Sequence, residues 1–186
     1  ELLTRSVHQR AGNFSPDGMT LYFTQRLPGR PSEIHKVLLD GTQRVEPVVA
    51  SSLINYDPQV SPDGKWLAFA SDSADGSGIY VLPLGGGERI RISDKGGYVP
   101  RWSPSGNELF FMENPPTLIM AKRGASGRWN EATLTTLFAI PNFRRGDSIT
   151  AFDVSPSGDT FLIGETRAGE GDGDIQVILN GDLKRP

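Results

Sequence analysis

The residue types that most often carry out catalysis are sparse in this sequence. Histidine, the commonest general base, occurs only as His8 and His35, and cysteine does not occur at all. No Gly-x-Ser-x-Gly segment is present, so the chain lacks the tight turn that exposes the nucleophilic serine of many hydrolases. His35 lies in an expected strand and His8 in the loop before one, where packing and surface roles are typical. We therefore predict that the chain is not an enzyme.

Two acidic, glycine-rich segments have the composition of a calcium-binding loop. They are residues 72–76 (Asp-Ser-Ala-Asp-Gly) and 170–174 (Glu-Gly-Asp-Gly-Asp). Closely spaced carboxylates can surround Ca²⁺ with oxygen ligands, but neither spacing matches an EF-hand, and the same residues dominate solvated hairpin loops. The sequence thus predicts no cofactor, with calcium as the alternative. The ligands would then come from Asp72, Asp75, Glu170, Asp172 and Asp174.

Charge and hydropathy exclude two classes of partner. The 19 Lys and Arg residues and the 22 Asp and Glu residues give a net charge of -3. The basic residues are scattered and form no stripe that could hold a phosphate backbone. No apolar run approaches the roughly 18 residues that a membrane-spanning helix needs. We expect neither nucleic-acid binding nor membrane insertion.

A five-residue pattern recurs four times along the chain. The copies are 14–18 (Phe-Ser-Pro-Asp-Gly), 60–64 (Val-Ser-Pro-Asp-Gly), 102–106 (Trp-Ser-Pro-Ser-Gly) and 154–158 (Val-Ser-Pro-Ser-Gly). Their serines are separated by 46, 42 and 52 residues, which is the period of a four-stranded propeller blade. Proline presets φ, the next residue can hydrogen-bond the backbone, and glycine accepts the positive φ that reverses the chain. Each copy therefore predicts the tip of a β-hairpin.

Strand-like segments around the four turns define four blades in a single domain. The blades are expected at about 11–50, 56–93, 98–139 and 149–180, and the innermost strand of the second at 58–61. The sequence therefore predicts an all-β protein, a β-propeller with four blades of four antiparallel strands.

The two ends of the chain each suggest part of a blade. The fourth blade lacks an outermost strand, whereas Leu2 to Ser6 looks like an outermost strand without a blade. Open sheet edges leave backbone groups unpaired, so a terminal strand often completes the last blade. We predict that Leu2 to Ser6 completes the fourth blade of the same molecule or of a neighbouring one.

The repeated turn and the aromatic-rich strand after it resemble the TolB-like, WD-repeat-like propeller repeat of bacteria over nearly the whole chain. Similar propellers occur in prolyl oligopeptidase-type enzymes, and the segment 152–186 resembles the C-terminal propeller part of a larger multidomain protein. Relatives usually close with six or more blades. The resemblance therefore implies part of a larger propeller, a closed four-bladed ring, or half of a ring formed by a homodimer. It also implies an extracytoplasmic location, periplasmic or secreted.

Loops that enter the innermost strands of a propeller converge on its channel and usually carry its function. Here they are the segments 7–10, 54–57, 96–101 and 144–148. They offer a mixed polar and aromatic set suited to holding a peptide, a protein loop or a glycan: Arg10, Tyr56, Asp57, Tyr98, Arg101, Arg145 and Asp147. The alternative role of those that stand before a proline is to position the start of a strand.

Trp129 stands outside the blade pattern, in the polar segment 127–130. It would either anchor a partner as an exposed aromatic or pack over the edge of the third blade.

Three functions are compatible with these features. The first is a non-catalytic scaffold that binds a protein partner through the channel-mouth loops. The second is a module that binds a carbohydrate or small ligand. The third is an accessory propeller within a larger peptidase- or kinase-linked enzyme.

Overall fold

The computed structural model describes residues 8–73, 76–140, 152–164 and 175–178, and these form strands, turns and one short 3₁₀ helix, η1 (Trp129–Glu131). The first sheet consists of β1 (His8–Phe14), β2 (Thr20–Arg26), β3 (Ser32–Leu38) and β4 (Val45–Val49). The second consists of β5 (Ile54–Val60), β6 (Trp66–Ser73), β7 (Gly76–Pro83) and β8 (Ile90–Arg91).

The remaining strands form two further antiparallel sheets. The third sheet consists of β9 (Tyr98–Trp102), β10 (Glu108–Glu113), β11 (Thr117–Lys122) and β12 (Thr133–Ala139). The fourth consists of β13 (Phe152–Val154), β14 (Phe161–Gly164) and β15 (Ile175–Ile178). Each sheet follows chain order from its innermost to its outermost strand, which confirms the all-β propeller architecture.

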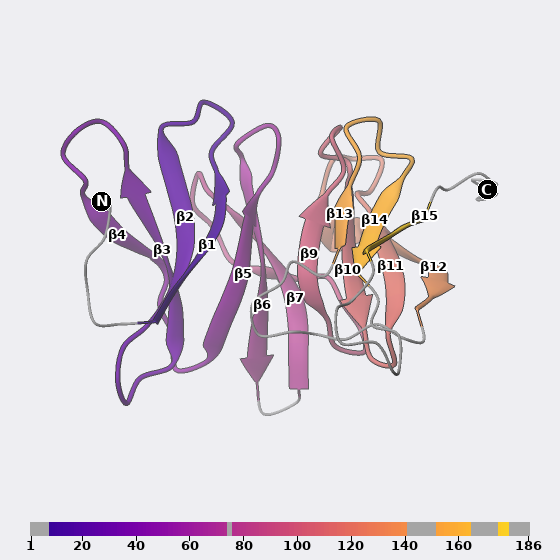
Figure 1. Cartoon of the computed structure of the whole chain (residues 1–186), viewed down its shortest axis with the longest axis horizontal. Coiled ribbons are helices and arrows are strands. Elements are labelled where there is room, and N and C mark those ends of the chain that lie inside the picture. Colours follow the sequence, from indigo (N-terminus) through magenta and orange to yellow (C-terminus); the bar gives the residue numbers. More distant parts are fainter. Residues whose placement is uncertain (1–7, 74–75, 141–151, 165–174, 179–186) are drawn as a thin grey trace.

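The first sheet lies at one end of the array, the second lies beside it, and the third and fourth overlap in the view at the other end (Figure 1). The innermost strands hold the array together, because β5 contacts the first sheet and β9 contacts the second, while β13 contacts β9. Among the described strands the array does not close into a ring. The terminal strand predicted at Leu2 to Ser6 lies outside the described residues.

The repeated serine fixes each hairpin through its side chain. Its hydroxyl accepts the backbone N–H of the residue five positions later, at 2.9, 3.0, 3.2 and 3.1 Å in the four copies. The motif glycine donates its N–H to the carbonyl of the same serine and has φ between 69 and 79°. These contacts confirm the predicted turns.

The hydrophobic core lies between neighbouring sheets. One cluster, which includes Tyr22, Val60 and Phe69, joins the first two sheets. A larger cluster joins the second, third and fourth sheets, where the rings of Phe110 and Phe161 meet edge to face with centroids 4.9 Å apart. The aromatic strands after the turns therefore serve packing between blades.

The innermost strands are longer than the sequence indicated. The strand expected at 58–61 begins at Ile54, and the segments predicted as loops before Pro58 and Pro100 are bulged strand. The bulges are made by Asp57 and Val99, which have φ of 54 and 53°. At each bulge the innermost strand has one extra residue, and its pairing with the next strand continues before and after the bulge. A positive φ is uncommon for residues other than glycine, so the sequence does not indicate a bulge at Asp57 or Val99 and predicts a loop there instead.

Gly12 on β1 provides a test of the packing between the first two blades. A Cβ at this position would lie 2.5 Å from the carbonyl oxygen of Pro58 and 2.9 Å from that of Tyr22. Because backbone atoms cannot move aside, we expect Gly12→Ala to lower the free energy of unfolding by about 1 to 3 kcal/mol. Gly85→Ala, which has open space around its Cβ, should change it by less than about 0.5 kcal/mol. Urea denaturation of both variants measures the difference, and equal stabilities would contradict the tight approach.

Ser61 provides a test of the turn chemistry. It is 1% exposed, and its hydroxyl accepts the N–H of Trp66 at 3.0 Å. Ser61→Ala leaves that donor without its acceptor, so we expect a loss of about 1 to 3 kcal/mol in the free energy of unfolding. Ser52→Ala on an exposed loop is the matched control. Thermal unfolding midpoints that fall equally in both variants would show that the hydroxyl does not hold the hairpin.

Candidate functional site on the innermost strands

The innermost strands bring three of the predicted site residues into one row. Arg10 on β1 forms an ion pair with Asp57 on β5, with 3.2 Å between Nη1 and Oδ1. The side chain of Asp57 is only 7% exposed, and its bulge conformation places it between the first two blades. A carboxylate this well buried needs a cationic partner, which Arg10 supplies.

Arg101 on β9 continues the row toward the fourth blade. Its Nη1 donates to the carbonyl of Pro100 at 2.7 Å, and its Nε lies 4.0 Å from Oδ1 of Asp153 on β13. Burial lowers the pKa of Arg101; the charges of Asp153 and Asp57 raise it, and that of Arg10 lowers it further. An arginine stays protonated in a protein, so the lowered pKa marks a cation whose lost hydration is not fully compensated by its neighbours.

The row therefore alternates in sign across all four blades, as Arg10, Asp57, Arg101 and Asp153. Asp153 was not among the predicted site residues. Aligning the repeats would have identified it, because Asp153 and Arg101 both stand two residues before a motif serine.

A cavity of about 250 Å³ opens beside this row, at the end of the innermost strands where the motif turns lie. Its wall combines apolar and charged side chains, among them Phe14, Pro16, Pro62, Arg101, Trp102 and Asp153. Phe14 is 53% exposed, whereas Trp102 is 9% exposed and donates its indole N–H to the carbonyl of Gln59 at 2.9 Å. The cavity thus offers an accessible ring and a cation within one concave surface.

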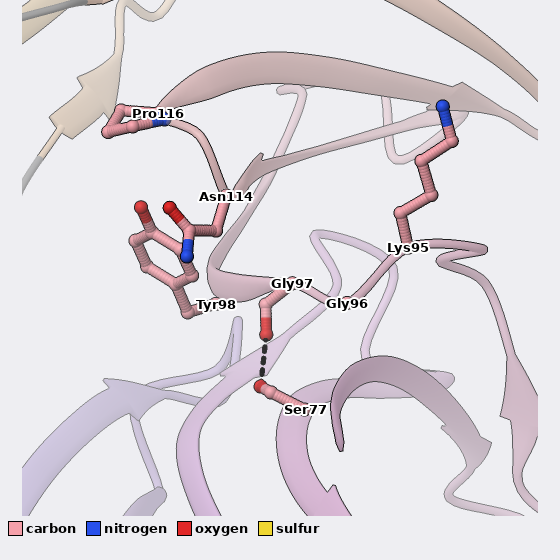
Figure 2. A pocket seen from close by; sticks show the side chains of 7 residues that line it. All are labelled: Ser77, Lys95, Gly96, Gly97, Tyr98, Asn114 and Pro116. Carbon is pink, nitrogen blue, oxygen red and sulfur yellow. Dashed lines mark hydrogen bonds between the residues drawn. The ribbon is translucent and has the colours of Figure 1, made fainter. Parts of the chain in front are cut away.

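A larger cavity of about 470 Å³ lies at the opposite end of the innermost strands (Figure 2). The ring of Tyr98 and the amide of Asn114 stand together on one side of it, and Lys95 stands on the other. Its floor is fixed by the hydroxyl of Ser77, which donates to the carbonyl of Gly97 at 2.8 Å. Tyr98 is therefore separated from Arg101, although both belong to β9, and the predicted site divides into two.

Tyr56 and Asp72 belong to a hydrogen-bonded group between these strands. The hydroxyl of Tyr56 donates to Oδ1 of Asp72 at 2.9 Å and lies 3.0 Å from Oγ of Ser77. Asp72 thus has a structural partner. Within the described ranges, no three His, Asp or Glu side chains come close enough to hold a metal ion. The other predicted residues lie outside those ranges: Asp75, Arg145, Asp147, Glu170, Asp172 and Asp174.

Trp129 is 1% exposed, which favours the packing role over the partner anchor. Its ring meets that of Trp102 edge to face, with centroids 5.1 Å apart, and Arg123 lies 6.0 Å above it. Of the two predicted roles the structure has the packed one, because the η1 turn folds the ring inward against the third sheet.

His8 and His35 lie on different strands, β1 and β3. His8 is exposed at the start of β1. His35 on β3 is 9% exposed, packs 5.8 Å from the ring of Phe23 and places its Nε2 3.0 Å from Oε2 of Glu33.

In the part of the chain that is described, no helix is long and apolar enough to cross a membrane.

Comparisons with known proteins point to one family. The crystal structure of TolB from Acinetobacter baumannii superposes with a TM-score of 0.72 at 21% identity, covering 95% of this chain and 42% of TolB. Uncharacterized protein Atu1656 of Agrobacterium fabrum is 24% identical over 167 residues, which are 86% of this chain and 56% of that protein.

A third relative matches a shorter segment. Uncharacterized peptidase YuxL of Bacillus subtilis is 41% identical over 56 residues, covering 28% of this chain and 8% of YuxL. The chain thus spans little more than half the length of Atu1656 and less of the other two. The family model of the TolB β-propeller domain matches residues 3–179, so the chain belongs to the TolB β-propeller domain family.

Proposed function

We propose that this chain is a non-catalytic interaction module that binds a protein segment at the turn-side end of the innermost strands. The observation that carries the proposal is Arg101, a largely buried cation whose nearest carboxylate among the described residues is 4.0 Å away. That distance exceeds the 2.7 to about 3.2 Å of a hydrogen bond. The guanidinium therefore has N–H groups to offer to an incoming acceptor.

The chemistry of the cavity defines the segment that would fit. A partner carboxylate can take two parallel N–H bonds from one guanidinium, which is a strong and directional contact in a desolvated place. Phe14 and Pro62 supply an apolar wall beside it. We therefore infer that the partner segment carries an aspartate or glutamate next to an apolar residue.

Two other functions have some support. The cavity at Tyr98 is of the size that small ligands occupy, and an aromatic ring beside Lys95 and Asn114 suits a glycan. The similarity to a segment of YuxL supports an accessory role in a larger peptidase. For the whole protein we propose an extracytoplasmic location, by analogy with TolB.

Peptide binding tests the main proposal. Peptides selected from a random displayed library on this chain should be enriched in acidic residues next to apolar ones. Arg101→Gln should weaken the affinity of a selected peptide about tenfold or more, since it removes the paired contact to the carboxylate. Asp153→Asn should strengthen it, because a competing carboxylate is lost. Titration calorimetry with the purified variants measures both effects.

Arg30→Gln, at an exposed turn between β2 and β3, is the matched control and should leave the affinity unchanged. Selection of peptides with no acidic preference, or equal affinities for the Arg101 and Arg30 variants, would count against the proposal. Binding of oligosaccharides that is lost in Tyr98→Ala would favour the glycan function instead.

A further inference from the structure

Two boundaries between blades can be compared residue by residue. We call the boundary between the first and second blades the first boundary, and that between the second and third blades the second boundary. Asn55 and Gly97 both stand six residues before the motif serine of their blade. The hydroxyl of Ser32 donates to the carbonyl of Asn55 at 2.9 Å, and that of Ser77 donates to the carbonyl of Gly97 at 2.8 Å. The same contact thus joins both pairs of blades, so the remaining differences show what is particular to each boundary.

The first difference is open space. Gly96 at the second boundary stands where the first boundary has Ile54, whose side chain is 46% exposed. A Cβ on Gly96 would have one described atom within 4 Å beyond its chain neighbours, the carbonyl oxygen of Ser77 at 3.3 Å. The cavity of about 470 Å³ at the second boundary therefore opens over a glycine, at a place that carries a large side chain at the first boundary.

The second difference is charge. Lys95 stands eight residues before its motif serine, where the first boundary has Leu53. Asn114 stands eleven residues after the same serine, where the second blade has Asp72. Each exchange moves the charge of the site one unit toward positive. The described residues that line the cavity accordingly include one cation and no carboxylate.

The floor of the cavity is held by hydrogen bonds within the second blade. The hydroxyl of Tyr56 lies 3.0 Å from Oγ of Ser77 and donates to Oδ1 of Asp72 at 2.9 Å. The carboxylate of Asp72 therefore has a partner behind the floor, and the acidic residues Asp94 and Glu113 are not among the lining residues. A floor that is already in place lowers the cost of ordering the site when a ligand binds.

The groups that face the cavity define the chemistry of its ligand. Lys95 and Asn114 are exposed and stand on different sides of it (Figure 2). An ammonium group only donates hydrogen bonds, whereas an amide both donates and accepts them, as a hydroxyl group does. Tyr98 and Pro116 add apolar surface. A ligand that matches all of these groups carries an anionic group, hydroxyl groups and a face of C–H groups.

We propose that the cavity binds a sugar acid, with the carboxylate of the sugar at Lys95 and its hydroxyl groups at Asn114. The volume is within the range of small-ligand sites. The proposal rests on the second function proposed above, ligand binding in the cavity at Tyr98, and narrows it to acidic sugars. It is independent of peptide binding at Arg101, because the two cavities lie at opposite ends of the innermost strands.

NMR titration of the isotope-labelled protein with glucuronate and with glucose tests the proposal. We expect both sugars to shift the amide signals of Gly96 and Asn114. Glucuronate should bind about threefold to fivefold more tightly, as an exposed ion pair allows. Lys95→Gln should make the two affinities equal by weakening the binding of glucuronate alone. Asn114→Asp should also remove the preference, because it restores the carboxylate that the second blade has at Asp72.

Two exposed positions outside the cavity provide matched controls. Lys65→Gln and Asn130→Asp make the same changes of charge and should leave both affinities unchanged. Arg101→Gln should leave them unchanged too, so that the result is separate from that for peptide binding. Equal affinities of the parent protein for the two sugars, or a preference that survives Lys95→Gln, would overturn the proposal of an acidic ligand. The absence of shifts with either sugar would overturn ligand binding in this cavity as well.

Discussion

The hydrogen bond from a strand N–H to the hydroxyl of the motif serine is the interaction on which the rest of the structure depends. It closes the hairpin between the two inner strands of every blade, with donor–acceptor distances between 2.9 and 3.2 Å. With the hairpin closed, the proline and the glycine of the motif stand at fixed places, and the proline of one turn packs against the glycine of the next. A Cβ on that glycine would lie 3.4 to 3.6 Å from the proline ring at Gly64, Gly106 and Gly158. One short motif thus sets both the fold of a blade and the spacing between blades.

The bulges in the innermost strands connect this scaffold to the candidate site. Asp57 and Val99 occupy the same place in the repeat and both adopt positive φ, which costs roughly 1 to 2 kcal/mol for a residue other than glycine. The packing around them must offset that cost, and both are buried. At Asp57 the bulge directs a carboxylate toward Arg10 on the preceding blade. Strain of this kind often accompanies functional positions, which agrees with a site on the row of charges.

The hairpins were predictable from sequence because their signals are local. Four residues, Ser-Pro-x-Gly, define the turn, the period between serines gives the length of a blade, and the four copies give the four sheets of this chain. The bulges were not predictable, since the residue before a proline favours extended backbone and nothing local favours the left-handed conformation at Asp57. The sequence left two roles open for Trp129, because only the ring of Trp102, 27 residues earlier, shows that the site for it is apolar. Asp153 is identified as a site residue only when the repeats are aligned and Arg101, which lies beside it, is taken as its equivalent in the preceding blade.

The residue two positions before each motif serine differs from blade to blade, and its contacts differ accordingly. Asn13 bonds the backbone N–H and carbonyl of Val60 at 2.8 and 3.2 Å. The backbone carbonyl of Gln59 accepts the indole N–H of Trp102, and Arg101 faces Asp153. The contact between proline and glycine is the same at the three boundaries between described blades, so it does not distinguish one boundary from another. The varied side chain distinguishes two of the boundaries, because the amide of Asn13 and the charge pair of Arg101 with Asp153 are different contacts. In the third and fourth blades this position carries Arg101 and Asp153, so the charge pair at this boundary also lines the candidate binding cavity.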